Sequence, residues 1–523
     1  MPLIKPPGYS RRSFLKSSAA KGAVLATGAS GISLFNINRS FAAMKNPADI
    51  LATINVGNKV NKDYRAQYKL GDNDLLWDPK KDWIRTVDWE AVRKEHAGKT
   101  VRFAIGAADA DSAKDETFTE LSGIKVELVP IPDDSMYDKV VAEFLGGKAS
   151  FDALQFFSPW LGDFAAQGFL AKLDDYAAKW KLPLDDFYET YRLNYGYFGD
   201  KGMYGIPFDC DIQQVHIRPS IIKKVTGKDV DRVNTIPSYA ELVKMAPEIA
   251  KVEKGVSAIG MMNARGFWAT YNWEHVAAQH GMMLFNDKWE PIFNGDAGVK
   301  GLETIIALSK HAIEGHAGAD WPTNRAAFLG GQIAVNISWQ DSGTQATRPD
   351  QSKLGDDVLT IYEPRVAGGM FAPPNIAGST SCVSSSSPNP EAAFLMLAYL
   401  TSASIMAMNE ANANGVAPGY KSVLANEKLR SVSQPAKVWA DELDYAWCAP
   451  RLPYTLQMEI ELGNELNKAI VGQQTAKQAL DNGVAAWKKI MTEKGGFYKG
   501  KDPVSYASME KGLYLGKGKK LPF

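Results

Sequence analysis

The sequence is poor in the residues that build disulfide frameworks and metal centres. Only three of its 523 residues are cysteine, Cys210, Cys382 and Cys448, and no two have the Cys-x-x-Cys spacing. Its six histidines show no helical ligand spacing of three or four residues either. We therefore expect neither a disulfide scaffold nor a bound metal ion.

An excess of one charge and the common cofactor motifs are also missing. Lys and Arg number 59, as do Asp and Glu, so the formal net charge is zero. Nucleic-acid binding needs a concentrated basic surface, which this balance disfavours. No P-loop, G-x-G-x-x-G, G-x-S-x-G or H-E-x-x-H motif occurs, so we expect no cofactor and none of the commoner hydrolase activities.

No segment approaches the roughly 20 apolar residues that cross a bilayer. The length predicts two or three domains. What the sequence does contain is aromatic residues, which make up 11% of the chain with 13 Trp and 20 Tyr. They are typical of a large buried core, and those that gather in loops could instead form stacking surfaces in a binding cleft.

The N-terminus is typical of an export signal. Residues 10–16 match the string S-R-R-x-F-L-K around Arg11 and Arg12, and a weakly apolar Ala/Gly-rich stretch follows. Small residues precede Ala43, and no cysteine follows that could carry a lipid. Residues 1–42 are therefore predicted to be a twin-arginine signal peptide, which would engage the twin-arginine export machinery and place the mature protein in the periplasm. A basic disordered tail is the alternative.

Residues 43–98 are polar, interrupted by Gly, Pro and Asn, and contain three tryptophans, Trp77, Trp83 and Trp89. This composition predicts an N-terminal extension that wraps the outside of a domain and has no core of its own.

Strands and helices alternate from residue 100 onwards. Residues 101–107, 125–131 and 151–157 have strand-like apolar patterns, and residues 136–147 and 160–170 have helical spacing. This order predicts an α/β fold with a parallel sheet and crossover helices. Ligands of such sheets bind beyond the carboxyl ends of the strands, where the loops are polar and aromatic here.

The middle of the chain repeats this pattern and then breaks it. Residues 203–217 and 332–340 read as strands, and residues 236–251 and 274–285 as helices. The Gly-, Pro- and Ser-rich patch at 366–390 separates them from a mostly helical C-terminal third. Such a patch between regular segments predicts that the chain crosses between lobes there.

Five stretches of the chain resemble the maltose-type extracellular solute-binding proteins of carbohydrate ABC importers. In family order they are residues 151–176, 204–222, 326–340, 377–402 and 414–424. The resemblance implies two lobes, each a mainly parallel sheet flanked by helices, joined by three hinge crossings around a trapped ligand. Lobe 1 would comprise 99–208 and 378–416, and lobe 2 with the C-terminal helices 209–377 and 417–523.

The resemblance also implies the ligand site, position by position. The residues carried over are Asp111, Ser158, Trp160, Asp211, Trp268, Tyr271, Trp273, Trp339, Ser379 and Tyr420, with Trp268, Tyr271 and Trp273 expected in a loop. Carboxylates can satisfy sugar hydroxyls, and flat rings can cover the C–H faces of a sugar. Asp211 could instead be a hinge acid paired with the backbone, and Trp339 could be core.

The sequence departs from this family at the third crossing. Where many members have Pro-x-Arg, this chain has Pro418, Gly419 and Tyr420, which argues against a ligand held by that arginine. The resemblance implies a carbohydrate ligand (a sugar or an oligosaccharide), an inner-membrane permease partner, a monomer, and no enzymatic activity.

Several alternatives remain at this point. The solute could be a polyol, a glycerophosphodiester, a polyamine or a small acid. A secreted glycosidase, polysaccharide lyase or oxidoreductase is a further possibility, since Asp109 with Asp111, or Asp209 with Asp211, could supply paired carboxyl groups. The resemblance also places Cys210 and Cys382 in adjacent crossings, where they could be bridged.

Overall fold

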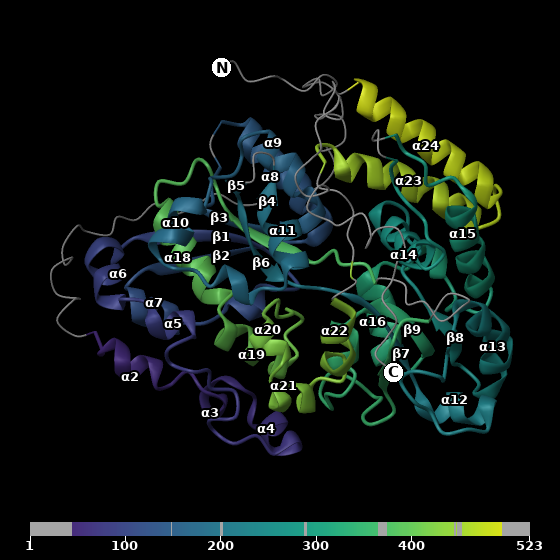
Figure 1. The fold of residues 1–523 in the computed structure, drawn as a ribbon, viewed down its shortest axis with the longest axis horizontal. Helices are drawn as coiled ribbons and strands as arrows, with labels where there is room; N and C mark the ends of the chain where they lie inside the picture. The colour runs from purple at the N-terminus through teal and green to yellow at the C-terminus, as the bar shows by residue number, and fades with distance from the viewer. Residues whose placement is uncertain are drawn as a thin grey trace, which may run out of the picture.

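The computed structural model describes residues 44–493 apart from 148, 199–201, 287–289, 365–373, 444–445 and 447–451. The predicted signal peptide and Cys448 therefore lie outside the described residues. The described chain forms two α/β lobes side by side, with lobe 1 on the left and lobe 2 on the right of Figure 1.

Lobe 1 is built on a five-stranded sheet of order β2-β1-β3-β11-β6. Its strands are β1 (Thr100–Gly106), β2 (Lys125–Ile131), β3 (Ala153–Phe157), β6 (Gly205–Asp209) and β11 (Ser379–Val383). β1 pairs parallel with β2 and β3, whereas β11 runs antiparallel to β3 and β6. The three parallel strands thus end at one edge of the sheet, which is where such sheets bind ligands.

Helices cover both faces of the lobe 1 sheet. They are α7 (Thr117–Ser122), α8 (Asp133–Leu145), α9 (Leu161–Ala166), α10 (Asp174–Lys179), α11 (Glu189–Gly196), α18 (Pro390–Leu400) and α19 (Ala403–Asn412), with short helices η2 (Ala110–Ala113), η3 (Ser158–Trp160) and η4 (Leu184–Asp186) and the ribbon β4 (Tyr197–Phe198) and β5 (Gly202–Met203). α18 is buried along its length because it lies inside the core of this lobe.

Lobe 2 is built on a four-stranded sheet of order β10-β7-β9-β8. Its strands are β7 (Gln213–Ile217), β8 (Ser257–Gly260), β9 (Ile333–Trp339) and β10 (Leu359–Ile361). Its helices are α12 (Pro219–Thr226), α13 (Tyr239–Val252), α14 (Phe267–Ala278), α15 (Asp296–Ser309), α16 (Trp321–Leu329) and α17 (Asp341–Gln345), with η5 (His316–Gly318). β9 is buried at all seven positions, as befits a central strand covered on both faces.

The C-terminal helices are α20 (Lys421–Leu424), α21 (Glu427–Val432), α22 (Ala436–Leu443), α23 (Thr455–Ile470) and α24 (Ala476–Glu493). α23 and α24 share the core of lobe 2 and lie along its upper edge in Figure 1. No single helix of the described residues is long and apolar enough to cross a membrane. Taken together, the bent pair α18 and α19 is long and apolar enough to do so by length and composition alone, but both helices are buried in the fold.

Two features of the sheets differ from the sequence-based expectation. Both sheets are mixed rather than mainly parallel, because strands that enter a lobe after a crossing pair antiparallel to their neighbours. The single strand predicted over residues 203–217 is divided into β5, β6 and β7. The apolar pattern continues through Cys210–Ile212, but the chain leaves the first sheet there and enters the second.

The N-terminal extension packs onto lobe 1 through its tryptophans. It forms α2 (Pro47–Leu51), α3 (Val56–Lys59), α4 (Lys62–Tyr68), α5 (Trp83–Thr86) and α6 (Trp89–His96). Trp89 packs edge-on against Phe118 and Tyr399 of lobe 1, with ring centroids 6.2 and 6.4 Å apart. These contacts place the extension in the same buried cluster as the lobe 1 sheet.

The extension also reaches the segment that follows α17. The Tyr64 hydroxyl donates to Asp350 at 2.6 Å, and the guanidinium of Arg348 lies 4.8 Å from the ring centres of both Tyr64 and Tyr68. Arg348 in turn donates to the carbonyl of Ala411 in α19. The extension therefore contacts both lobes.

Cys210 and Cys382 are both free and buried, so they are not bridged. The strand register explains this result: Cys382 pairs with Gly205, whereas Cys210 follows Asp209 at the other end of β6. Burial raises the pKa of both thiols.

Candidate ligand site between the lobes

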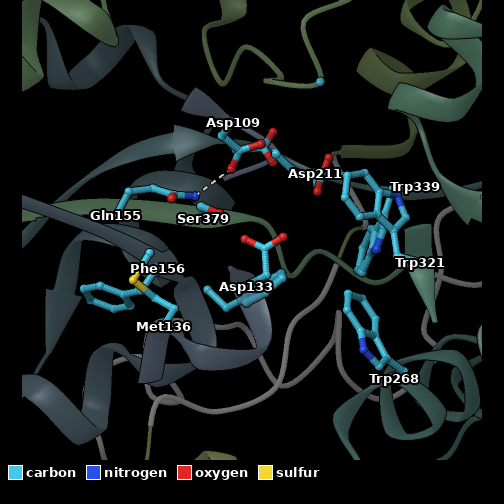
Figure 2. Close-up of a pocket in the computed structure, with 14 residues that line it drawn as sticks. Asp109, Asp133, Met136, Gln155, Phe156, Asp211, Trp268, Trp321, Trp339 and Ser379 are labelled. Atoms are coloured by element: carbon cyan, nitrogen blue, oxygen red, sulfur yellow. Dashed lines mark hydrogen bonds between the residues drawn. The ribbon is translucent and has the colours of Figure 1, made fainter. Parts of the chain in front are cut away.

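A cavity lies where the lobes and the crossings meet (Figure 2). Fourteen residues line it: Ala108, Asp109, Asp133, Met136, Gln155, Phe156, Phe157, Asp209, Asp211, Trp268, Trp321, Trp339, Ser379 and Gly415. Lobe 1 supplies two of the four carboxyl groups that line the cavity, the first crossing supplies the other two, and lobe 2 supplies three indoles. Acids and aromatic rings thus face one another across the cavity.

Lobe 1 reaches the cavity from the ends of its three parallel strands. Asp109 follows β1, Asp133 begins α8 after β2, and Phe157 ends β3. Gln155 of β3 orients this edge: its amide donates to Asp109 Oδ2 at 2.8 Å and its carbonyl accepts from Gly106 N–H at 2.7 Å. The absence of a side chain at Gly106 leaves room for Asp133, whose Oδ1 lies 2.6 Å from where a Cβ would stand.

Lobe 2 reaches the cavity with Trp268, Trp321 and Trp339. Trp268 lies in the first turn of α14, Trp321 begins α16, and Trp339 ends β9. Trp268 and Trp339 belong to a small buried cluster that is separate from the main core of lobe 2. Trp268 also packs edge-on against Phe157 of lobe 1, with ring centroids 6.0 Å apart, so the lobes touch beside the cavity.

The first crossing supplies Asp209 and Asp211, and hydrogen bonds fix both. Asp209 Oδ1 accepts the Ala417 N–H of the third crossing at 2.8 Å. Asp211 Oδ1 accepts from the Gln340 amide at 2.6 Å, and the Gln340 carbonyl accepts from Ile212 N–H at 2.8 Å. The backbone-paired hinge acid considered from the sequence is thus Asp209, whereas Asp211 is held by a side chain.

The crossings pass so close together that one of them requires glycine. A Cβ at Gly378 would stand 2.0 Å from the carbonyl oxygen of Asp209, a distance that atoms do not tolerate. The next residue, Ser379, pairs with Phe157 on one side and with Asp209 on the other. Ser379 therefore enters the cavity between the ends of β3 and β6.

The acids of the cavity resist ionisation. Burial, followed by the charge of Asp133, raises the pKa of Asp109 to about 7. Burial also raises the pKa values of Asp209 and Asp211, and the neighbouring carboxyls add to the effect. Asp341, at the start of α17, behaves likewise, although its ion pair with Arg325 at 3.3 Å opposes the shift. Like charges that share a dry site cannot all ionise at low cost.

Four of the ten residues predicted from the sequence line the cavity: Asp211, Trp268, Trp339 and Ser379. Tyr271 lies behind Trp339 and donates to Glu459 at 3.1 Å. Ser158 is buried beside the second crossing, where its N–H donates to the Gly378 carbonyl at 2.8 Å. Neither residue is part of the lining.

The other four, Asp111, Trp160, Tyr420 and Trp273, lie away from the cavity. Asp111 is exposed and paired with Lys114, because the chain turns into η2 after Asp109. Trp160 packs against Tyr137 in the core of lobe 1. Tyr420 packs against Phe187 with tilted rings whose centroids are 4.0 Å apart, on the side of lobe 1 that the extension covers.

Trp268, Tyr271 and Trp273 lie in helix α14 and not in a loop as expected. Helical geometry then separates them, since residues three apart share a face and residues five apart do not. Trp273 consequently points into the core of lobe 2, where its indole donates to the Gly298 carbonyl at 3.0 Å.

The principal residues missed from the sequence are Asp109, Asp133, Asp209 and Trp321. A signal for Asp133 was available, because it follows β2 at the same edge of the sheet as the residues after β1 and β3. Asp109 lies in the loop that was predicted, two residues before the one chosen. Trp321 had no comparable signal, since its place depends on how α16 packs beside β9.

A group of potential metal ligands lies elsewhere. Within the described ranges, Glu95, His96 and Glu391 are the one set of three His, Cys, Asp or Glu residues whose ligand atoms lie within 4.8 Å of one another. Lys179 already pairs with Glu391 at 2.5 Å and neutralises part of that charge.

Two α/β lobes, three crossings and a lined cavity between them define the architecture of a solute-binding protein. The sequence profile of the bacterial extracellular solute-binding protein family matches residues 99–407, more than half of the chain. This protein therefore belongs to that family. The extension at 44–98 lies outside the matched region.

Known proteins similar to this chain include a Sinorhizobium fredii protein named "Probable amino-acid ABC transporter periplasmic-binding protein", 24% identical over 415 residues, 77% of this chain and 92% of the relative. The ribitol complex of an ABC transporter solute-binding protein from Agrobacterium radiobacter K84 has a TM-score of 0.68 at 21% identity, covering 75% of this chain and 99% of the other. Maltose-bound MalE3 of T. maritima has a TM-score of 0.68 at 20% identity, covering 75% and 100%. At these identities the solved structures establish the shared fold.

Proposed function

We propose that this protein is the periplasmic receptor of an ABC importer, which captures a carbohydrate or polyol between its lobes and releases it to an inner-membrane permease. The observation that carries the proposal is the composition of the cavity, with carboxyl groups from lobe 1 and the first crossing opposite Trp268, Trp321 and Trp339 of lobe 2. Carboxyl groups pair with hydroxyls, and indole faces cover the C–H surface of a sugar or polyol.

The names of the similar proteins mention an amino acid, ribitol and maltose. We therefore choose between these ligand classes from the side chains that line the cavity. An amino acid presents a carboxylate, which is bound by a cation or by backbone amides. None of the described lining residues is Lys, Arg or His. A hydroxylated ligand without an acid group suits these side chains better.

Enzymatic cleavage of a glycosidic bond is disfavoured by the placement of the carboxyl groups. Asp111 points away from the cavity, so it cannot act opposite Asp109. Asp209 and Asp211 belong to the same short crossing and share a hydrogen bond, so a glycosidic bond has no room to lie between them. The proposed receptor is a monomer without chemistry of its own, exported through the twin-arginine pathway.

A thermal-shift screen of the mature protein against sugars, oligosaccharides and polyols tests this function. A ligand at a hundredfold excess over its dissociation constant stabilises the folded state by about 2.7 kcal/mol. A specific shift confirmed by calorimetric titration supports the proposal. A library that leaves the melting temperature unchanged throughout contradicts it.

A further inference from the structure

Trp321 differs from the other two indoles of the cavity in how its ring is held. Trp268 and Trp339 are buried, with 6% and 2% of their surface exposed, and each packs against a further aromatic ring. Trp321 is only half-buried and lies at the margin of the same aromatic cluster. A side chain with open space beside it can change rotamer, so core packing alone does not fix the orientation of this ring.

The backbone of Trp321 is fixed from two sides. Asp320 caps α16 by accepting the Thr323 N–H at 2.9 Å, and the Asn324 amide donates to Asn336 of β9 at 2.7 Å. The two bonds set where α16 begins beside the sheet. They place the Cα atom of Trp321 at the cavity but leave its side-chain torsions free.

Arg325 makes the contact that fixes the ring. It follows Trp321 by four residues, so the two side chains lie on the same face of α16. The centre of its guanidinium lies 3.8 Å from the ring centre of Trp321, a distance at which two flat groups stack. Trp321 is part of the cavity lining and Arg325 is not. The guanidinium therefore covers the side of the indole that faces away from the cavity.

The guanidinium is itself anchored. Its Nη1 donates to Asp341 Oδ2 at 3.3 Å, and Asp341 is buried at the start of α17, two residues after the end of β9. This hydrogen bond needs only an acceptor oxygen, which the Asp341 carboxyl group offers whether it is ionised or protonated. The indole N–H of Trp321 lies near the same carboxyl group without a hydrogen bond to any described residue, so Arg325 provides the link.

The orientation of the ring matters for a sugar or polyol. An indole covers the C–H surface of such a ligand only when its face is turned toward it. A ring that has to be ordered during binding loses rotamer freedom at the expense of affinity, whereas a ring that is already oriented does not.

We propose that Arg325 is a positioning residue of the ligand site, which stacks on Trp321, is anchored by Asp341, and holds the indole in the orientation that receives the solute. Arg325 acts through Trp321, because it does not line the cavity itself. This inference rests on the proposed receptor function and adds the residue that orients one of its binding surfaces.

The orientation of the ring can be tested in the free protein by ¹⁹F NMR after labelling with 5-fluorotryptophan. The Trp321 signal is identified by its loss in Trp321→Phe. In Arg325→Met this signal should broaden or divide, because the ring then samples several rotamers. Arg192→Met is the matched control: Arg192 pairs with Glu189 outside the cavity lining, and its side chain is 26% exposed against 24% for Arg325. An unchanged line width and unchanged relaxation rates in Arg325→Met overturn the inference.

A double-mutant cycle tests whether the effect reaches the ligand through Trp321. Calorimetric titrations use ribitol, D-sorbitol and maltose as probes. For a probe that binds, Arg325→Met should lower the affinity about tenfold in the otherwise unchanged protein and less than about twofold in the Trp321→Ala background. An equal loss in both backgrounds overturns the inference.

Arg325→Lys separates the flat stacked group from the charge. Lysine keeps the positive charge and can donate to Asp341, but it has no planar group to lay on the indole. This variant should bind the same probe about threefold or more weakly than the wild type, and full retention of affinity overturns the inference. Thermal unfolding checks that every variant is folded. If neither the probes nor the compounds of the screen bind, the receptor function fails, and the ¹⁹F signal of Trp321 alone then supports or overturns the role of Arg325.

Discussion

Asp163 of lobe 1 accepts the backbone N–H of Tyr454, which precedes the first residue of α23 on lobe 2. The N–H groups of Thr455 and Leu456 point at the same carboxyl group, and the Tyr137 hydroxyl donates to it at 3.3 Å. A carboxylate at a helix N-terminus satisfies amides that have no partner within the helix. Here the carboxylate and the helix belong to different lobes.

Because the contact joins the two lobes, we expect Asp163 to stabilise a closed arrangement, in which the lobes touch each other. Asp163→Ala removes the acceptor, and water reaches the α23 amides more easily when the lobes separate. We expect a larger radius of gyration in small-angle scattering for the free variant, and weaker binding because the closed state must be recovered. The surface variant Asp111→Ala should not differ from the wild type. An unchanged radius for Asp163→Ala contradicts a role in closure.

Trp339 and Trp273 form a matched pair of buried tryptophans. Trp339→Ala should lower ligand affinity by about 2–4 kcal/mol, because the indole faces the cavity. Trp273→Ala should instead lower the free energy of unfolding by about 3–5 kcal/mol, because Trp273 lies in the core of lobe 2. Calorimetric titration and chemical unfolding of both variants make the comparison. The cavity assignment fails if Trp339→Ala destabilises the fold and binding stays normal.

Asp109 and Asp163 should each make the free protein less stable as the pH rises. The pKa values of Asp109 and Asp163 are both raised by burial from about 3.8 to about 7. The folded state therefore binds more protons than the unfolded state between these values, and its stability falls as the pH increases from about 4 to about 7. Melting temperatures measured at pH 5 and pH 8 should decrease accordingly. Asp109→Asn should lose less stability between pH 5 and pH 8 than the wild type does, and a variant with the same pH dependence as the wild type would exclude the shift of Asp109.

The N-terminal extension should contribute to the stability of lobe 1. Trp89→Ala removes a ring that packs against Phe118 and Tyr399, and should cost about 3–5 kcal/mol of unfolding free energy. Leu76→Ala is the control from the same extension, since its side chain is exposed, and should change stability by at most about 0.5 kcal/mol. Equal effects in denaturant unfolding would mean that the extension is not part of the core.

Export should depend on the paired arginines of the N-terminal motif. Replacing Arg11 and Arg12 with Lys keeps the positive charge but removes the residues of the twin-arginine signature. The precursor should then remain in the cytoplasm, as measured by cell fractionation. Full periplasmic yield from the double variant would show that another export route is used.

The sequence by itself determined the class of fold and the edge of the sheet at which the ligand site lies. Alternating apolar runs predicted β1, β2 and β3, and the rule for parallel sheets placed the loops after them at one edge. Asp211, Trp268, Trp339 and Ser379 were identified because each belongs to a local pattern that resembles a known family. Such patterns can be identified from the sequence alone because they depend on residues that are neighbours along the chain.

Only the tertiary structure decided which side chains face the cavity. Asp109 and Asp111 lie in the same polar loop, and the turn into η2 directs one inward and leaves the other in solvent. Trp268 and Trp273 are separated by the rotation of α14, which an apolar sequence without a clear period does not reveal. The side chain that each turn presents depends on contacts with residues far away in the sequence, such as the hydrogen bond from Gln155 to Asp109.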